Sequence, residues 1–425
     1  MRLRAPARNT AARRILLIAP HGSYRTAPFL AAAGQRGIEV LIASEAGHSL
    51  VGAYAQGLHI DLDDPPASLQ IILREAQRQP FAAVLASDDS TTELAALVAD
   101  ALGLPHNPVA AVRLARRKDL ARARLAQAGV PVPRHWRLDV TRPLAAQIDD
   151  IRFPCVLKPV ALSASRGVIR ADSRAQLLAA AARIQVLLAG AGLADPDERD
   201  TILVEEFIAG AEIAIEGLLT HGRLDILAVF DKPDPLDGPY FEESYYITPS
   251  RLDSRILRGV HDTVSAVCAA YGLRQGPIHA ECRINAQGIW ILEVAARTIG
   301  GSCGRLLRFG TGHGLEELVM MHALGERPDL RAETGGAGVL MIPIPRAGIL
   351  RRVEGVLAAQ RVPHVEALII DVREGHELVP LPEGASYLGF IFARAPSAEQ
   401  AEAALRAAHA CLRVVVAPLW KAVAG

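Results

Sequence analysis

The chain has 425 residues, of which 50% are hydrophobic and 22% are charged. This composition excludes a disordered chain and predicts a packed globular protein of about three domains. Lys and Arg together number 46, as do Asp and Glu, so the overall charge gives no reason to expect a nucleic-acid or membrane partner.

The five cysteines are scattered along the chain, and no Cys/His spacing suggests a zinc site. We expect them to be small core residues of a protein in a reducing compartment, the cytoplasm. Residues 1–13 form an Arg-rich leader, which we expect to be a flexible tail. The apolar run at 15–19 is too short for a signal peptide or a membrane span, and no stretch of about 20 apolar residues occurs elsewhere.

The first hundred residues alternate between strand and helix patterns. Residues 15–19, 38–44 and 81–87 are predicted strands separated by helical segments, which indicates a doubly wound parallel sheet. Ligands of such sheets lie beyond the carboxyl ends of the strands, where "HGSYR" (21–25) and "SDDS" (87–90) fall. The first loop lacks a G-x-G-x-x-G pattern, which argues against a dinucleotide.

A later strand, "FPCVLKPV", contains Lys158 near its end and is followed by the loop "ALSASRGV" and a helix over 172–190. Small residues such as Ser163, Ser165 and Gly167 let backbone N–H groups approach phosphate oxygens, and a lysine adds a positive charge. The pattern indicates a phosphate site. The alternative is a lysine that points into solvent before an ordinary loop.

The segment "VEEFIAGAEIAIE" begins a pair of strands that turn at residues 221–222. Ile213 and Ile215 point to one side of the strand, and Glu212 and Glu216 to the other. A glutamate beside a nucleotide pocket can bind ribose hydroxyls. The alternative is the solvated side of a half-buried hairpin.

The stretch "IHAECRINAQGIWILEVAARTIGG" (278–301) is predicted to be a β-hairpin. We expect a three-residue turn over 286–288, whose last position is left-handed and favours glycine. This register pairs Ala280 with Val294, Cys282 with Leu292 and Ile284 with Trp290 on an apolar face. The other face would carry His279, Glu281, Arg283, Ile291 and Glu293. A two- or four-residue turn would place the two glutamates on opposite faces.

In the preferred register Glu281 lies directly opposite Glu293, with Cβ atoms about 5 Å apart, and like charges so placed repel. A Mg²⁺ ion relieves this repulsion, since it takes one or two carboxylates together with substrate phosphates. A shared proton is a second way. The third is neutralisation by Arg283 and Arg297 on a solvated face.

These segments, in this order, resemble the ATP-grasp superfamily, over about half the chain from Lys118 to Gly325. The resemblance rests on "RRKDLARARLAQAGVP", "FPCVLKP", "SASRGV", "VEEFIAGAE", "FDKPD", "HAECRI" and "ILEVAARTIGG". Within the superfamily the chain is most similar to carboxylate–amine ligases of the L-amino acid ligase kind, on "VFDKPDPLDGPYFEESYYITPS" and "EVAARTIGGSCGRLLRFGTGHGLEEL".

The resemblance implies an α/β and α+β protein. A doubly wound parallel-sheet domain precedes an ATP-grasp fold of two α+β subdomains that clasp ATP, and a strand-rich α+β domain follows. The expected boundaries, after the leader at 1–13, are 14–113, 114–230 (linker helix and small lid subdomain), 231–330 (catalytic subdomain) and 331–425.

The resemblance also implies an ATP-dependent ligase that forms an amide or peptide bond through an acyl phosphate and releases ADP and phosphate. The cofactors would be ATP and Mg²⁺, with Mn²⁺ as an alternative. The substrates would be a small-molecule carboxylate and an amine, with an L-amino acid among them, and the protein would be a homodimer. The alternatives are an enzyme of carboxylase or carbamoyl-phosphate type, and a non-catalytic ATP-binding subunit.

The implied site residues carry over by position. Arg297 and Lys158 would be catalytic, and Glu281 and Glu293 would hold the metal. ATP would be bound by Lys118, Lys158, Ser163, Ser165, Gly167, Glu205, Glu206, Phe207, Ile208 and Glu212. Many relatives carry an Asn where this chain has Ala295, so a second metal would lack one protein ligand or lie differently.

Substrate residues are predicted on weaker grounds. Arg305 and Arg308 follow the last strand and could clamp a carboxylate with two hydrogen bonds each. Tyr246 lies in a Pro/Gly-rich segment that could line a pocket, and His279 lies beside Glu281. The "HGSYR" loop would help to shape the acceptor site.

Overall fold

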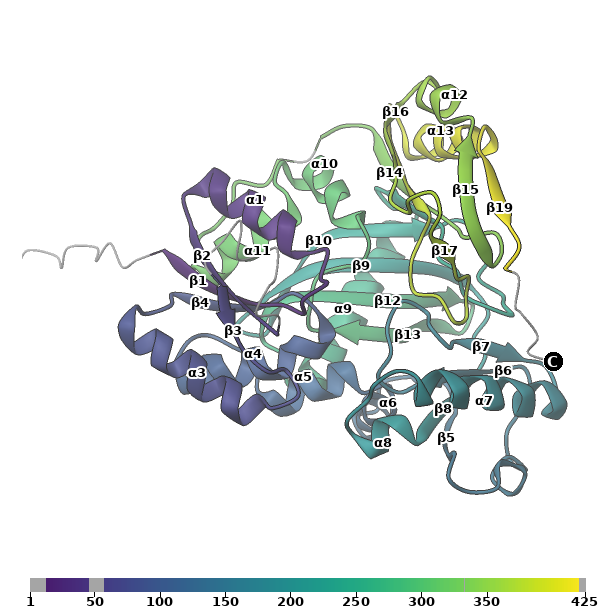
Figure 1. The fold of residues 1–425 in the computed structure, drawn as a ribbon, viewed down its shortest axis with the longest axis horizontal. Helices are drawn as coiled ribbons and strands as arrows, with labels where there is room; N and C mark the ends of the chain where they lie inside the picture. The colour runs from purple at the N-terminus through teal and green to yellow at the C-terminus, as the bar shows by residue number, and fades with distance from the viewer. Residues whose placement is uncertain (1–12, 46–56, 332, 420–425) are drawn as a thin grey trace, which may run out of the picture.

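The computed structural model describes residues 13–45, 57–331 and 333–419 (Figure 1). Apart from Arg13, the predicted leader lies outside the described residues. The described chain forms a parallel N-terminal sheet, a small antiparallel sheet at the lower right of Figure 1, and a long sheet through the centre. The strands of the long sheet come from both the middle and the C-terminal part of the chain. A short sheet closes the C-terminal part.

The N-terminal sheet is four-stranded and parallel, in the order β3-β2-β1-β4. Its strands are β1 (Arg14–Ile18), β2 (Glu39–Ser44), β3 (Gly57–His59) and β4 (Ala83–Ala86). Helix α1 (Thr26–Arg36) packs on one face, and α3 (Pro65–Arg78) and α4 (Asp89–Ala101) pack on the other. The predicted doubly wound sheet is confirmed, and the polar loops after β1 and β4 reach the same edge.

A second four-stranded sheet, here called the lid sheet, is antiparallel in the order β5-β8-β6-β7. Its strands are β5 (His135–Asp139), β6 (Cys155–Pro159), β7 (Ile169–Ala171) and β8 (Thr201–Glu206). Helix α7 (Arg174–Ala189) buries its Leu and Ile side chains against the sheet. The connecting helices are α5 (Val109–Arg116), α6 (Lys118–Gln127) and the short α8 (Pro196–Arg199).

The central sheet has eight strands in the order β13-β12-β9-β10-β11-β14-β18-β16. They are β9 (Ala211–Thr220), β10 (Arg223–Lys232), β11 (Tyr245–Thr248), β12 (Gln275–Asn285), β13 (Gly288–Ala295), β14 (Gly336–Ile342), β16 (Val365–Ile370) and β18 (Gly389–Ala395). Helix α9 (Ser254–Tyr271) covers the apolar face of β9, β12 and β13. The sheet runs without a break from the predicted catalytic subdomain into the C-terminal one.

The C-terminal part adds a three-stranded sheet in the order β17-β15-β19. Its strands are β15 (Gly348–Glu354), β17 (Glu377–Leu378) and β19 (Arg413–Ala417), and helix α13 (Ala398–Ala410) packs on β14 and β18. Helices α10 (Leu307–Thr311), α11 (Leu315–Ala323) and α12 (Val356–Gln360) complete the chain. The domain boundaries stay a prediction.

The hairpin of β12 and β13 places Glu281 directly opposite Glu293, as predicted, but by a different route. The turn has two residues between the paired Asn285 and Gly288, and the register shifts once beyond Glu281. A bulge at Leu292 therefore restores the register that the shorter turn would have lost. The predicted pairing of Ala280 with Val294 is also confirmed, but the other two predicted pairs are wrong, since Cys282 pairs with Ile291 and Ile284 with Ile289.

The bulge also exchanges two side chains between the faces of the hairpin. Ile291 is fully buried in the core with Cys282, whereas it was expected on the polar face. Leu292 lines the cleft on the other side. The three-residue turn was wrong because sequence patterning cannot separate a longer turn from a shorter turn with a bulge.

The five cysteines are all free, and all but Cys411 are buried, as expected of core residues. Burial raises the pKa of Cys155 and of Cys268, each to about 12, so these thiols are unreactive. In the described part of the chain, no helix combines the length and the apolar character needed to cross a membrane.

Candidate active site

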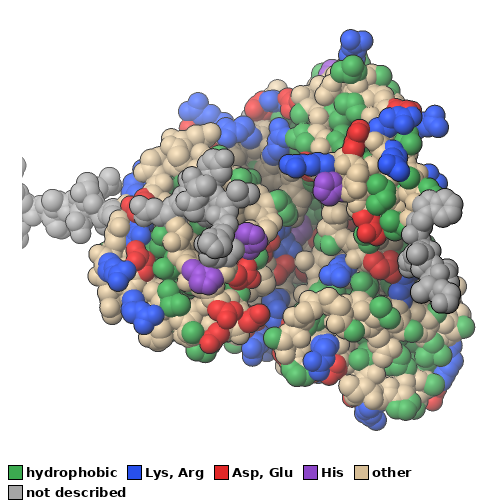
Figure 2. All heavy atoms as spheres, viewed as in Figure 1, with side chains coloured by type: hydrophobic (Ala, Val, Ile, Leu, Met, Phe, Trp, Pro, Cys, Tyr) green, Lys and Arg blue, Asp and Glu red, His purple; other side chains and the backbone are tan. Residues whose placement is uncertain are grey.

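A cleft of about 1100 Å³ lies where the N-terminal sheet, the lid sheet and the central sheet meet. Figure 2 shows it as a hollow near the centre of this face, with acidic and basic side chains inside it. Loops of the C-terminal part, among them residues 371–372 and 385–387, close one side. Every part of the fold therefore contributes to one cavity.

The floor of the cleft is one face of the central sheet. Charged side chains alternate with apolar ones along its strands, so one face is polar and the other is buried against α9. Across β9 and β12, Glu216 lies opposite His279, and Glu212 lies opposite Arg283. The polar face carries Glu212, Glu216, Lys232, His279, Glu281, Arg283 and Glu293.

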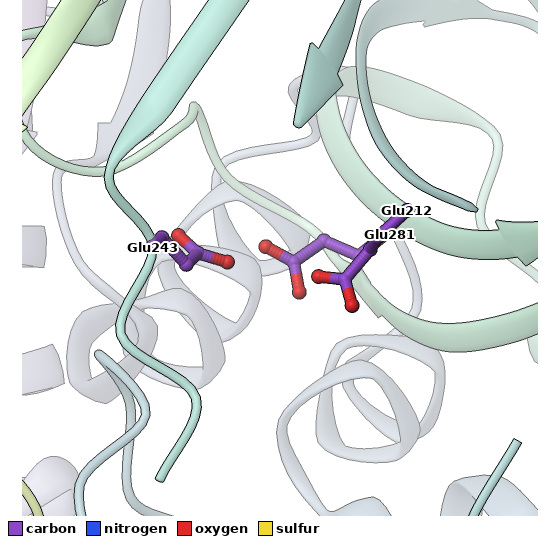
Figure 3. Close-up of side chains that lie close together, drawn as sticks. All are labelled: Glu212, Glu243 and Glu281. Carbon is purple, nitrogen blue, oxygen red and sulfur yellow. The ribbon is translucent and has the colours of Figure 1, made fainter. Parts of the chain in front are cut away.

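Three carboxylates on this floor surround one ammonium group. Oxygens of Glu212, Glu243 and Glu281 lie within 4.8 Å of one another, and Figure 3 shows the carboxylates pointing toward one another. The Lys232 Nζ lies 2.9 Å from Glu212 and 3.2 Å from Glu281, and it also contacts Glu243. A buried lysine thus occupies a place where the side chains could hold a cation.

The titration of these groups follows from burial and crowding. Burial and the neighbouring Glu281 raise the pKa of Glu243 to about 7, against the opposing effect of Lys232. Burial alone would lower the pKa of His279, but the carboxylates of Glu216 and Glu281 outweigh it and raise the value to about 9. His279 is therefore an imidazolium at neutral pH, with its ring nitrogens 3.3 and 3.4 Å from those carboxylates.

The two opposed glutamates are compensated by different lysines. Glu281 contacts Lys232, and the Glu293 Oε2 lies 3.5 Å from the Lys118 Nζ. Neither arginine of the third interpretation forms an ion pair with these glutamates among the described residues, since Arg283 pairs with Glu212 and Arg297 with Asp89, although the charge of Glu293 also acts on Arg297. The lysines leave both carboxylates facing the cleft.

Arg297 is buried at the edge of the cleft and is held from two sides. Its Nε donates to Asp89 Oδ2 at 2.7 Å, and its Nη1 donates to the Thr298 carbonyl at 2.9 Å. Burial would lower the pKa of Arg297, but Asp89 and Glu293 outweigh it and raise the value. Asp89 comes from the predicted "SDDS" loop at the end of β4, and no role was predicted for it.

Lys158 and Glu205 are joined in a buried ion-pair network at the wall of the cleft. The Lys158 Nζ lies 2.7 Å from Glu205 Oε2, and the Arg122 Nε lies 2.7 Å from Glu205 Oε1. Burial would raise the pKa of Glu205, but Arg122 and Lys158 lower it to about 2. Glu205 was predicted to line the adenine; its carboxylate here fixes Lys158.

Replacing Glu205 with glutamine is expected to lower the free energy of unfolding by about 3–5 kcal/mol at pH 7, because two buried cations lose their counter-ion. The folded pKa of Glu205, about 2, lies below its ordinary 4.5. Its contribution is therefore complete above pH 4.5 and is lost as the pH falls toward 2. Unfolding midpoints of both proteins at several pH values should converge in acid. Glu206→Gln, next to it and without an ion pair among the described residues, should change stability little.

The segment that follows, Glu206 to Ile208, lines the cleft as predicted for the adenine hinge. Arg283 donates to the Ile208 carbonyl at 2.7 Å and lies with its guanidinium 4.9 Å from the Phe207 ring centre. Glu212 was predicted to bind ribose, and its carboxylate bonds Lys232 and Arg283. The ATP contacts of these residues stay predictions.

The predicted phosphate loop closes over the cleft and touches the C-terminal part. Ser163 and Ser165 line the cleft, and Ser165 has a left-handed backbone (φ 53°). Gly167 also has a left-handed backbone (φ 73°), and a Cβ there would lie 2.8 Å from Pro159. Its N–H donates to the Pro382 carbonyl at 2.9 Å. Glycine is thus required by both backbone and space.

A salt bridge reinforces this contact. Arg183 of α7 binds the Glu383 carboxylate with two nitrogens, one of them at 2.8 Å, and Arg166 donates to the Glu383 carbonyl at 3.1 Å. The lid sheet is therefore docked on the loop between β17 and β18.

The predicted substrate residues separate into two groups. Tyr246 and His279 lie in the cleft, with the Tyr246 hydroxyl donating to Glu243 at 2.7 Å. Arg305 also lines the cleft, and its guanidinium stacks 4.1 Å from the Phe392 ring centre. Arg308 is not part of the lining; it lies on the exposed surface, 4.0 Å from Glu317.

Sequence reasoning missed Lys232, Glu243 and Asp89. Lys232 ends an apolar strand, as Lys158 does, and that shared signal could have identified it. Glu243 lies in an irregular segment before β11, where no periodicity indicates which way a side chain points. Ala295 is fully buried opposite His279 in the β12–β13 register.

Family models match three parts of the chain. An ATP-grasp N-terminal domain matches residues 30–106, an ATP-grasp domain matches 151–305, and an L-amino acid ligase C-terminal domain 2 matches 340–417. The models together cover the N-terminal sheet, the cleft and the C-terminal part.

Relatives of known name share part of the chain. Dapdiamide A synthase of Enterobacter agglomerans is 26% identical over 257 residues, 58% of this chain and 57% of that protein. Alanine–anticapsin ligase of Bacillus subtilis is 25% identical over 257 residues, 57% of this chain and 54% of that protein. The chain thus spans little more than half the length of these relatives.

Among solved structures, the L-amino acid ligase from Bacillus licheniformis matches with a TM-score of 0.79 and 25% identity, over 95% of this chain and 98% of that one. A phosphoribosylglycinamide synthetase from Anaerococcus prevotii matches with a TM-score of 0.67 and 15% identity, which shows a shared fold.

Proposed function

Since this chain belongs to the ATP-grasp superfamily, we propose that it is an ATP-dependent ligase that joins a carboxylate to an amine, with an L-amino acid as one substrate. One observation supports this most strongly. Glu281, Glu293, Lys158 and Arg297 come from separate elements and all face one cleft. That combination can hold a divalent cation and neutralise phosphate charge.

The side chains fit a Mg²⁺ ion. Hard cations take oxygen ligands, and carboxylates of Glu281, Glu293 and Glu243 face the cleft. The positive charge of Lys232 among three carboxylates supports a floor that attracts cations. When bound, Mg²⁺ would neutralise charge that develops on the transferred phosphoryl group. Mn²⁺, with similar ligands, is the alternative.

The chain's own residues then have distinct tasks. ATP is clasped between the hinge at residues 206–208 and the loop with Ser163 and Ser165. A substrate carboxylate oxygen attacks the γ-phosphorus, which breaks the bond to ADP and gives an acyl phosphate. Lys158 and Arg297, each fixed by a carboxylate, stabilise the transferred group without having to reorient.

The amine nitrogen then attacks the acyl carbon, loses a proton and releases phosphate as the amide forms. The acyl phosphate has to be kept from water meanwhile. The docked lid supports this step, because the contacts of Gly167 with Pro382 and of Arg183 with Glu383 close the cleft on one side.

Two other functions have less support from the observations. Biotin carboxylases share the fold at 16% identity, but the match at residues 340–417 to an L-amino acid ligase domain favours amide formation. A non-catalytic ATP-binding subunit is favoured only by Ala295. A homodimer and a cytoplasmic location stay predictions.

Phosphate release tests the proposal. The protein is incubated with ATP and Mg²⁺ across a matrix of paired L-amino acids, and each product is identified by mass. We expect release above background only with particular pairs, together with ADP and a condensed product. Omission of either partner is the control. ATP binding without turnover for every pair, or release that does not depend on a partner, contradicts the proposal.

A further inference from the structure

One end of the cleft, lined by Gly300, Gly301 and Gly304, carries two charged groups that the proposed ATP and metal contacts do not use. Arg25 is the residue that precedes α1, and Glu316 lies in the first turn of α11. Both line the cleft beside the glycines at 300 and 301. The Tyr24 hydroxyl accepts a hydrogen bond from the Gly301 N–H at 2.6 Å, which fixes the loop that carries Arg25 against this end.

The guanidinium of Arg25 is held in place by one ion pair, but two of its nitrogens have no acceptor among the described residues. Its Nη1 binds Asp88 Oδ1 at 2.5 Å, and its side chain is about nine-tenths buried. Among the described residues no acceptor bonds its Nη2, and its Nε is buried without a partner. A Cβ placed on Gly300 would lie 3.4 Å from Nη2, so the guanidinium edge comes close to the bare backbone at 300.

Glu316 supplies the opposite charge. Over residues 13–45, 57–331 and 333–419, its carboxylate forms no hydrogen bond or ion pair with another side chain. Its Oε1 would lie 3.7 Å from a Cβ on Gly304. Burial raises the pKa of Glu316, and the positive charge of nearby Arg25 acts against that rise. Arg25 and Glu316 are therefore close enough to interact electrostatically, but their charged atoms do not come within 4.0 Å of each other.

Arg25 keeps Nε and Nη2 without an acceptor beside its ion pair with Asp88, and the partly buried Glu316 carboxylate has no side-chain partner among the described residues. A ligand that carries both charges would complete the two groups. An amino acid in its zwitterionic form carries a carboxylate and an ammonium on one carbon, which matches this pair. Gly300 lies beside Arg25 and Gly304 beside Glu316, so no side chain at these two positions fills the space next to the charged groups. Of the two arginines predicted to bind a substrate carboxylate, Arg308 does not line the cleft, and Arg305 is exposed and stacks on Phe392, so it is less well fixed than Arg25.

We propose that Arg25 and Glu316 form the subsite for the amine substrate, and that this substrate is an α-amino acid with a free carboxylate. Arg25 binds the carboxylate and Glu316 binds the ammonium group before it is deprotonated for attack. This inference rests on the proposed ligase function, in which the first substrate presents its own carboxylate near Arg297 and Lys158.

Hydroxylamine separates the two proposals, since it traps an acyl phosphate as a hydroxamate and has no carboxylate to bind. The amino acid that gives the fastest phosphate release is used as amine, and its amide is used as a carboxylate-free analogue. Rates of product formation are measured for the wild type, Arg25→Lys and Glu316→Gln. Glu317→Gln is the matched control, because its side chain contacts Arg36 and His313 outside the cleft.

We expect the rate with the amino acid, divided by the rate with hydroxylamine, to fall about tenfold to a hundredfold in both subsite variants, as for a lost hydrogen bond to a charged group. The preference for the amino acid over its amide should vanish in Arg25→Lys. Glu317→Gln should keep the wild-type ratio. A change of less than threefold in either subsite variant overturns the subsite. Absence of hydroxamate in the wild type instead contradicts the ligase function itself.

Discussion

Replacing Glu293 with glutamine is expected to reduce ATP-dependent product formation about a hundredfold to a thousandfold. The carboxamide keeps the shape of the side chain but removes the charge opposite Glu281. It also leaves Lys118 without its ion-pair partner at 3.5 Å. A weaker cation site should show as a higher Mg²⁺ concentration for half-maximal phosphate release, which is measured by Mg²⁺ titration at saturating ATP.

The loss has to be separated from unfolding. Glu293 is partly exposed, so the thermal midpoint of Glu293→Gln should stay close to that of the wild type. Asp262→Asn, on the exposed side of α9, removes the same charge away from the cleft and should keep full activity. If Glu293→Gln retained a third or more of the wild-type rate with an unchanged Mg²⁺ requirement, Glu293 would not be a metal ligand.

Replacing Lys232 with methionine is expected to lower the free energy of unfolding by about 3–5 kcal/mol in the absence of divalent cations. The substitution fills a similar volume, but it leaves carboxylates of Glu212, Glu243 and Glu281 within 4.8 Å of one another without an ammonium group between them. Millimolar Mg²⁺ should restore part of the loss, because a cation that binds only the folded state stabilises it.

Unfolding midpoints with and without Mg²⁺ measure both effects, and the increase on adding Mg²⁺ should be larger for the variant than for the wild type. Arg223→Met is the control, since Arg223 lies at the other end of the same strand, is exposed and, among the residues that the structure describes, pairs only with Asp225. A Lys232→Met protein as stable as the wild type without Mg²⁺ would show that the three carboxylates are not held ionised together.

The sequence predicted the large elements well, because they depend on periodic patterns. Alternation of strands and helices gave the N-terminal sheet, and residues 221–222 turn between β9 and β10 with the left-handed backbone that tight hairpins need. The opposition of Glu281 and Glu293 was also predicted. The turn itself was not, since a bulge at Leu292 and a two-residue turn give the same opposition of Glu281 and Glu293 as a longer turn.

The site was harder to predict, because its groups depend on which distant residues meet. Glu205 is buried in ion pairs with Arg122 and Lys158. The sequence of its own strand does not indicate that helix α6, which carries Arg122, packs against it. The partner of Arg297 is Asp89, which lies 208 positions earlier. An ion pair between separate domains produces no periodic pattern in the sequence. The sequence therefore predicted a role for Arg297 but not for Asp89, which orients it.

The unbroken central sheet means that the chain cannot be divided where its sequence suggests. Strand β11 pairs with β14 over Tyr245↔Leu340 to Thr248↔Ala337, which crosses the predicted boundary near residue 330. Removal of the C-terminal part would strip β11 of its neighbour and leave a bare strand edge, the kind of edge that promotes aggregation. The C-terminal part is therefore no detachable module: it could be exchanged between related proteins only together with the strand that carries Tyr246.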